Sequence, residues 1–339
     1  MNIVILDDYQ DAVRKLACFE RLAGHEVKVF NNNVKGAGQL AVRLRDAQAV
    51  VLNRERTTLN AAVLARCPKL RLLVQTGRVG AHVDLEACSR LGIAVLEGGT
   101  DPAPTAEFTW ALIMAAMRRL PQYVANLKQG AWQQSGLKSQ SMPVNFGLGQ
   151  RLAGKTLGIW GYGRVGCLVA GYGRAFGMRV LVWGSDESLR RAQADGLAAA
   201  ADREQLFTQS DVLSLHLRLH ESTRGLVTLA DLSQMKPDAV MVNAARAELI
   251  APDALVAALN RGRPGMAAVD VFESEPIMRG NPLLRLENAI CTPHIGYVDE
   301  LHYEHLFGQA FDAILRFADG ERSGVVNPEA LRHKDWASG

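Results

Sequence analysis

Residues 156–166 read TLGIWGYGRVG, an apolar run followed at once by a glycine-rich turn. Gly161, Gly163 and Gly166 fit the pattern GxGxxG, and the helix-like run CLVAGYGRAFG comes next. In such a unit the first glycine permits a tight turn and the second lets the backbone approach a pyrophosphate. The third lets the helix pack on the strand. A second strand, VLVW (180–183), completes the unit, so the stretch predicts a dinucleotide site.

The run GYGRAFG (171–177) repeats the opening of this pattern. No strand precedes it, and it falls where the helix after the turn is expected. Glycines inside a helix each cost about 1 kcal/mol relative to alanine. We therefore assign the dinucleotide site to residues 161–166 alone.

Short apolar runs alternate with helix-length segments along the whole chain. The first set is IVIL (3–6), EVKVF (26–30), AVVL (49–52), LRLLVQ (70–75) and IAVLE (93–97). The second set is LGIW (157–160), VLVW (180–183), VLSLH (212–216), AVMVNA (239–244), MAAVDV (266–271) and AICTPH (289–294). This rhythm predicts an α/β protein with two parallel sheets built from βαβ units. The segment GGTDPAPT (98–105) is typical of a domain crossing, and the helical pattern of 300–318 is expected to pack back on the first unit.

Composition and charge exclude several classes of function. The net charge of +3 is too small to indicate nucleic acid or an anionic membrane as partner. Five scattered cysteines without a CxxC pair favour a reducing cytoplasm over a zinc module or a disulfide framework. The start MNIVILDD lacks the basic region of a signal peptide, and FTWALIMAAM (108–117) is too short to span a bilayer of ~30 Å. His302 and His305 have no third ligand nearby, so no metal site is expected.

Polar residues stand at the ends of the strands in the second set. VLSLH ends in His216 and AICTPH ends in His294. Arg246 comes shortly after AVMVNA, and MAAVDV contains Asp270 and is followed by Glu275. Ligands of open α/β sheets bind outside the carboxyl ends of the strands. His294 could exchange a hydroxyl proton during hydride transfer, with Glu275 orienting its ring and Arg246 pairing with a substrate carboxylate. The pattern predicts hydride transfer to or from a carbinol carbon.

The motifs around these residues resemble the D-isomer-specific 2-hydroxyacid dehydrogenase family, which includes 3-phosphoglycerate dehydrogenase and glyoxylate/hydroxypyruvate reductase. The resemblance rests on NAARAEL (243–249), AAVDVFESEP (267–276) and CTPHIG (291–296), and extends through QTGRVGAHVDLEACSRLGIAV (75–95), PTAEFT (104–109), LAGKTLGIWGYGRVG (152–166) and DVLSLHLRLHESTRGLV (211–227). It covers nearly the whole chain, with 133–150 the least typical part. It implies two Rossmann-like domains, with an NAD(P)-binding domain (104–298) inserted into a flavodoxin-like substrate-binding domain (1–103 and 299–339).

The resemblance also implies residue roles. Arg246, Glu275 and His294 correspond to the catalytic residues, and Asp270 to a contact of the nicotinamide carboxamide. Backbone groups of Arg78, Val79 and Gly80, with the side chain of Arg54, are expected to hold the substrate, although a surface ion pair explains Arg54 equally well. Together the motifs and the resemblance give these cofactor-binding residues: Thr105, Gly161, Tyr162, Gly163, Arg164, Val165, Gly166, Gly184, Ser185, Asp186, His216, Ala244, Ala245, Asp270 and Gly296.

Two departures from the family pattern stand near these residues. Tyr297 follows His294-Ile295-Gly296 where the family commonly has a small residue, and it is expected to add a wall to the substrate pocket. Ala245 and Ala247 flank Arg246 where the family commonly has NASRG. Neither departure removes a catalytic group.

The cofactor preference depends on VLVWGSD (180–186). An NAD site carries an acid here for the ribose hydroxyls, and the same acid repels the 2′-phosphate of NADP. With Gly184 in that place, discrimination should be weak. Ser185 and Arg190 or Arg191 favour a phosphate, whereas Asp186 favours NAD. We expect both cofactors to be accepted, with a slight lean to NADP.

Two other functions fit the same fold. In formate dehydrogenases, by resemblance, the partner of the catalytic histidine is Gln rather than Glu. Glu275 therefore argues against that function. A dinucleotide-sensing corepressor would usually carry disordered tails, and this chain has little beyond LRHKDWASG (331–339). We therefore expect an oxidoreductase acting on a small 2-hydroxy or 2-keto acid. By resemblance it is a homodimer that associates through the apolar helix predicted over 106–119.

Overall fold

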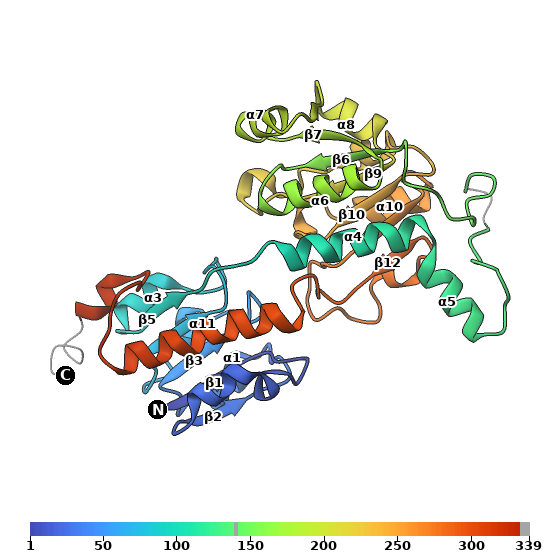
Figure 1. Cartoon of the computed structure of the whole chain (residues 1–339). Coiled ribbons are helices and arrows are strands. Elements are labelled where there is room, and N and C mark those ends of the chain that lie inside the picture. The colour runs from blue at the N-terminus through green and yellow to red at the C-terminus, as the bar shows by residue number, and fades with distance from the viewer. Residues whose placement is uncertain (139–141, 333–339) are drawn as a thin grey trace. The chain divides into compact units, whose positions relative to one another are not determined.

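The computed structural model describes residues 1–138 and 142–332 (Figure 1). Part of the polar stretch 133–150 and most of the tail 331–339 therefore lie outside the described residues. The chain forms two compact units, residues 1–101 with 298–339 and residues 102–297. Each unit is an α/β fold built on one parallel sheet, which confirms the predicted fold class.

The first unit has a five-stranded sheet with the order β2-β1-β3-β4-β5. The strands are β1 (Asn2–Ile5), β2 (Glu26–Val29), β3 (Ala49–Leu52), β4 (Leu72–Gln75) and β5 (Ala94–Glu97). One face of the sheet is covered by α1 (Ala37–Leu44), α2 (Ala61–Leu64) and α3 (Leu85–Arg90). This is the flavodoxin-like order, in which ligands bind beyond the carboxyl ends of the strands.

Helix α11 (Glu300–Ala318) packs against strand β4 of this sheet and against the short helix η2 (Ala17–Leu22) of the same unit. Asp299 caps its first turn by accepting a hydrogen bond from the backbone N–H of His302. Its buried apolar side chains recur at helical spacing, and they are Tyr303, Leu306, Phe307, Ala310, Phe311, Ile314 and Phe317. The predicted return of 300–318 to the first unit is confirmed.

The second unit has a seven-stranded parallel sheet with the order β12-β11-β10-β9-β6-β7-β8. The strands are β6 (Thr156–Trp160), β7 (Arg179–Trp183), β8 (Ala198–Ala199), β9 (Val212–Leu215), β10 (Val240–Asn243), β11 (Met266–Val269) and β12 (Ala289–Cys291). The strand order reverses between β6 and β9, which is where a Rossmann fold binds its ligand. Strand β8 was not predicted, because two residues carry no periodic signal.

Helices cover both faces of this sheet, and this explains why its strands are apolar without alternation. One core contains side chains of α4 (Ala103–Met117), α6 (Arg164–Ala175) and α7 (Asp186–Ala194). The other contains side chains of α8 (Arg203–Gln209), α9 (Leu229–Ser233) and α10 (Ala254–Asn260).

The helix predicted over 106–119 begins three residues earlier and ends two residues earlier, and a second helix follows it. Helix α4 ends at Met117, and α5 (Leu120–Lys128) begins after Arg119, whose φ of 55° is left-handed. The fully buried guanidinium of Arg119 donates to the carbonyl oxygens of Ala116 and Phe146. These bonds stabilise the break, and burial lowers the pKa of Arg119 to about 10.

The described residues contain no helix long and apolar enough to cross a membrane. They also contain no group of three or more His, Cys, Asp or Glu side chains that could hold a metal ion.

Candidate active site

The turn between β6 and α6 leaves no room for a side chain at its first and third glycines. An added Cβ on Gly161, whose φ is +100°, would lie 2.7 Å from the carbonyl oxygen of His216. A Cβ on Gly166 would lie 2.2 Å from the carbonyl oxygen of Gly161. Both approaches are too close for any other residue.

The start of α6 fits a phosphate group. Gly163 is the N-cap of the helix, and no side chain caps the first turn. A Cβ at Gly163 would meet nothing within 4 Å, so the space beside the N-cap is open. Uncapped backbone N–H groups and the positive end of the helix dipole attract anions. The residues present therefore fit the pyrophosphate of a dinucleotide.

The end of β7 carries the residues that the sequence assigns to the adenosine ribose. Gly184 follows the strand, and Ser185 caps α7 by accepting a hydrogen bond of 3.4 Å from the backbone N–H of Ser188. Asp186 is the first residue of α7 and is exposed. The hydroxyl of Ser185 is thus engaged in the cap of the helix.

His216 follows β9, next to the glycine turn. One of its ring nitrogens, Nε2, lies 2.9 Å from the hydroxyl oxygen of Ser214. Desolvation of the ring lowers the pKa of His216 to about 4, so the ring is neutral at physiological pH. The neutral ring of His216 is therefore suited to contact a cofactor rather than to act as an acid or a base.

The three proposed catalytic side chains come from adjacent strands. Arg246 follows β10, Glu275 follows β11 and His294 follows β12, and these strands are neighbours in the sheet. Nδ1 of His294 lies 2.7 Å from Oε2 and 2.9 Å from Oε1 of Glu275. Both side chains are about three-quarters buried, with exposed fractions of 24% and 23%. A carboxylate this close holds the orientation of the imidazole ring.

Asp270 holds the segment that carries His294. Its buried carboxylate accepts hydrogen bonds from the Thr292 hydroxyl (2.7 Å) and from the backbone N–H groups of Ile295 (2.9 Å) and Gly296 (2.8 Å). Burial raises the pKa of Asp270, and the three donors oppose that rise. His294 has a left-handed φ of 54°, which a non-glycine residue keeps only when its surroundings hold it there. The sequence did not indicate this role of Asp270.

Side chains of α4 and the segment after His294 complete this part of the site. A Cβ on Gly296 would lie 3.4 Å from the ring of Phe108 and 3.9 Å from the methyl group of Thr105. The ring of Tyr297 meets that of His294 edge-on, with 6.1 Å between the ring centroids. Tyr297 is buried, so it forms a wall next to the imidazole.

The residues predicted to contact substrate lie in the first unit, after β3 and β4. Arg54 has a left-handed φ of 57°, and its backbone N–H donates to the Thr76 hydroxyl. A Cβ on Gly77 would lie 2.6 Å from Nη1 of Arg54, so Gly77 leaves room for the guanidinium.

Glu97, at the end of β5, was missed by sequence reasoning. It accepts hydrogen bonds from Nη1 of Arg78 (3.0 Å) and from the backbone N–H of Val79 (2.9 Å). The prediction that the Val79 N–H holds a substrate carboxylate is not supported in this structure, because Glu97 already binds that N–H. Of the predicted loop, Arg78 and Gly80 remain as candidates for contacts with the substrate. The only sequence signal for Glu97 was its place at a strand end.

Comparison with known proteins identifies the family. Residues 110–296 match the model of the NAD binding domain of D-isomer specific 2-hydroxyacid dehydrogenases. The chain belongs to this family. It is 36% identical to a glyoxylate reductase from Aeropyrum pernix over 272 residues, which are 80% of each chain.

Solved structures agree in fold. A Ralstonia solanacearum oxidoreductase with a provisional D-3-phosphoglycerate dehydrogenase assignment is 61% identical, with a TM-score of 0.97 over 98% of both chains. A phosphoglycerate oxidoreductase from Vibrio cholerae is 47% identical, with a TM-score of 0.90 over 95% of this chain and 100% of that one. The predicted family and enzyme class are confirmed: this 2-hydroxyacid dehydrogenase is an NAD-dependent oxidoreductase.

Proposed function

We propose that this dehydrogenase transfers a hydride between a nicotinamide dinucleotide and C2 of a D-2-hydroxy acid or the matching 2-keto acid. The cofactor supplies or accepts the hydride when it is bound. His294 donates a proton to the carbonyl oxygen during reduction and accepts it during oxidation. The observation that carries the proposal is the contact of 2.7 Å between His294 and Glu275.

The other residues bind and orient. Arg246 pairs with the substrate carboxylate and polarises the reacting oxygen, since a guanidinium matches a carboxylate in a two-pronged contact. Glu275 orients the imidazole of His294 through its contact with Nδ1. In this proposal residues 104–298 hold the cofactor, and residues 1–103 and 299–339 bind the substrate through Arg54 and the backbone of Arg78 and Gly80. A cytoplasmic location, expected from the cysteine pattern, stays a prediction.

The substrate is proposed to be a small 2-keto acid of the glyoxylate class, as the name of the Aeropyrum pernix relative suggests. Both NADH and NADPH are proposed to serve, with the slight lean to NADP that Gly184 suggests. The corepressor alternative loses support, because these relatives are oxidoreductases.

The experiment is a screen of glyoxylate, hydroxypyruvate, pyruvate and 3-phosphohydroxypyruvate with each reduced cofactor. With the best pair, His294→Ala should lower kcat by about 10²- to 10⁴-fold while NADH binding persists. The control is His305→Ala, which removes an exposed imidazole from α11. Near-wild-type turnover in His294→Ala would refute the assigned mechanism.

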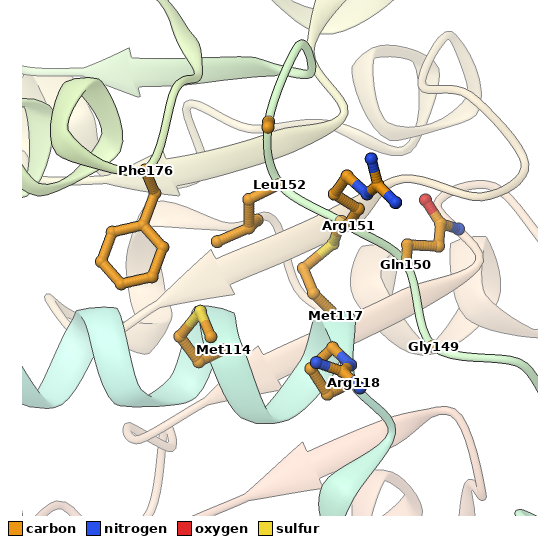
Figure 2. A pocket seen from close by; sticks show the side chains of 9 residues that line it. Met114, Met117, Arg118, Gly149, Gln150, Arg151, Leu152 and Phe176 are labelled. Carbon is orange, nitrogen blue, oxygen red and sulfur yellow. The ribbon is translucent and has the colours of Figure 1, made fainter.

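We also infer a homodimer that associates through the face of α4 and α5. An open cavity of about 490 Å³ lies there, where Met114 on α4 and Phe176 after α6 face the same space (Figure 2). A second cavity, of about 890 Å³, shares Met114 and Arg118 with the first. None of the three catalytic candidates lines either cavity, so these hollows suit side chains of a second copy better than a substrate.

A further inference from the structure

Helix α7 begins with a balanced set of charges. Two acids, Asp186 and Glu187, are followed by two bases, Arg190 and Arg191. Oε2 of Glu187 lies 2.7 Å from Nη2 of Arg190, and Oε1 lies 3.8 Å from Nε of Arg191. One carboxylate therefore engages both guanidinium groups.

These charges stand beside the glycine turn. Nη2 of Arg191 donates a hydrogen bond of 2.6 Å to the carbonyl oxygen of Tyr162. The hydroxyl of Tyr162 in turn donates to Asp195, at the end of α7. Two contacts thus hold α7 against the turn, and its first residue comes two positions after Gly184.

We propose that Glu187 determines how strongly the enzyme discriminates between NAD(H) and NADP(H), an inference that rests on the dinucleotide site proposed for residues 161–166. A 2′-phosphate is bound best by guanidinium groups that offer parallel N–H donors. In this chain the phosphate competes with Glu187 for Arg190 and Arg191, and the carboxylate also repels it. Glu187 thereby replaces in part the repulsive acid that Gly184 lacks.

The neighbouring groups do not fill this role. The Ser185 hydroxyl is engaged in the cap of α7, at 3.4 Å from the backbone nitrogen and 3.3 Å from the hydroxyl oxygen of Ser188. Asp186 makes no ion pair with either arginine in the described part of the chain, whereas Glu187 pairs with both. The side chain of Glu187 is 59% exposed, so its ion pairs contribute little to stability, and its replacement should leave the fold intact.

The test measures dissociation constants of NADH and NADPH by quenching of protein fluorescence. Glu187→Gln should tighten NADPH binding about three- to fivefold, the upper end of the range for one exposed charge pair, and leave NADH within about twofold. The gain should shrink at about 0.5 M salt, because exposed charges are screened there. Adding Arg190→Gln and Arg191→Gln to Glu187→Gln should abolish the gain.

The control is Glu204→Gln, which removes one exposed charge from α8 and should leave the ratio of the two constants unchanged. An unchanged ratio in Glu187→Gln, or an equal change in Glu204→Gln, would overturn the proposal while the dinucleotide site stands. A ratio that changes in Asp186→Asn but not in Glu187→Gln would overturn it as well. A wild-type protein that binds neither NADH nor NADPH would refute the dinucleotide site itself.

Discussion

His294 illustrates how a catalytic side chain is held at the scale of a single residue. Its backbone is left-handed, a conformation that costs roughly 1–3 kcal/mol for a non-glycine residue. Asp270 offsets part of that cost through its hydrogen bonds to the backbone of Ile295 and Gly296, and Glu275 binds the imidazole directly. His294 is therefore held through both its backbone segment and its ring before any substrate arrives.

Glu275→Gln should lower kcat/KM for keto-acid reduction by roughly 10- to 100-fold, because the imidazole of His294 loses the carboxylate that orients it. The measurement is kcat/KM with the best keto acid, with Glu273→Gln, an exposed acid of the same segment, as the control. A wild-type kcat/KM in Glu275→Gln would remove Glu275 from the catalytic set.

At the scale of the element, the packing of the strand–turn–helix unit explains why glycines occur in both runs, GYGRVG (161–166) and GYGRAFG (171–177). At Gly161 and Gly166 of the turn, a Cβ would collide with a backbone oxygen, whereas Gly163 faces open space. In the second run, GYGRAFG, Gly173 lets α6 approach β6, because its Cβ would lie 2.5 Å from a methyl carbon of Leu157. Gly171 meets nothing within 4 Å. Only the first run is therefore shaped for a ligand.

Gly166→Ala should weaken NADH binding at least tenfold, since the new methyl group displaces the turn from Gly161. The matched control is Gly171→Ala in the same helix, which should keep NADH binding. Gly171→Ala should also raise the free energy of unfolding by up to about 1 kcal/mol, because alanine favours a helix. Fluorescence titration and denaturant unfolding measure the two effects. Wild-type NADH affinity in Gly166→Ala would contradict the assignment of the turn.

At the scale of the whole molecule, α5 suggests how two copies associate. The helix has no buried residue, and Leu120, Val124 and Leu127 are each exposed by 45–55%. Their spacing of four and three residues places them on one face of the helix. An apolar stripe of this kind is typical of a protein–protein contact.

The wild-type enzyme should sediment as a dimer at micromolar concentration, and Leu127→Glu should shift it towards the monomer. A charge buried in an apolar contact without a partner is costly. Leu301→Glu is the control, because Leu301 is 81% exposed and lies on α11 of the other unit. Sedimentation velocity separates the two species. A wild-type monomer, or equal dissociation in both variants, would refute this interface.

The sequence by itself determined the two parallel sheets, the glycine turn and the polar strand ends. Each has a local signal: short apolar runs between helices, three glycines at set spacing, and a polar residue where a strand stops. Because strands β10, β11 and β12 are neighbours, Glu275 and His294 could be expected to meet although 19 residues separate them.

Only the tertiary structure decided which contacts hold or engage the residues of the site and its surroundings. Glu97 engages the Val79 N–H, Asp270 holds the segment of His294, and Arg119 ends α4 through Phe146, which lies 27 residues away. Glu187 lies close to its arginines in sequence, but their place beside Tyr162 depends on how α7 packs. Side chains that meet through packing leave no periodic trace in the sequence, because their positions follow from the folded backbone rather than from local preference.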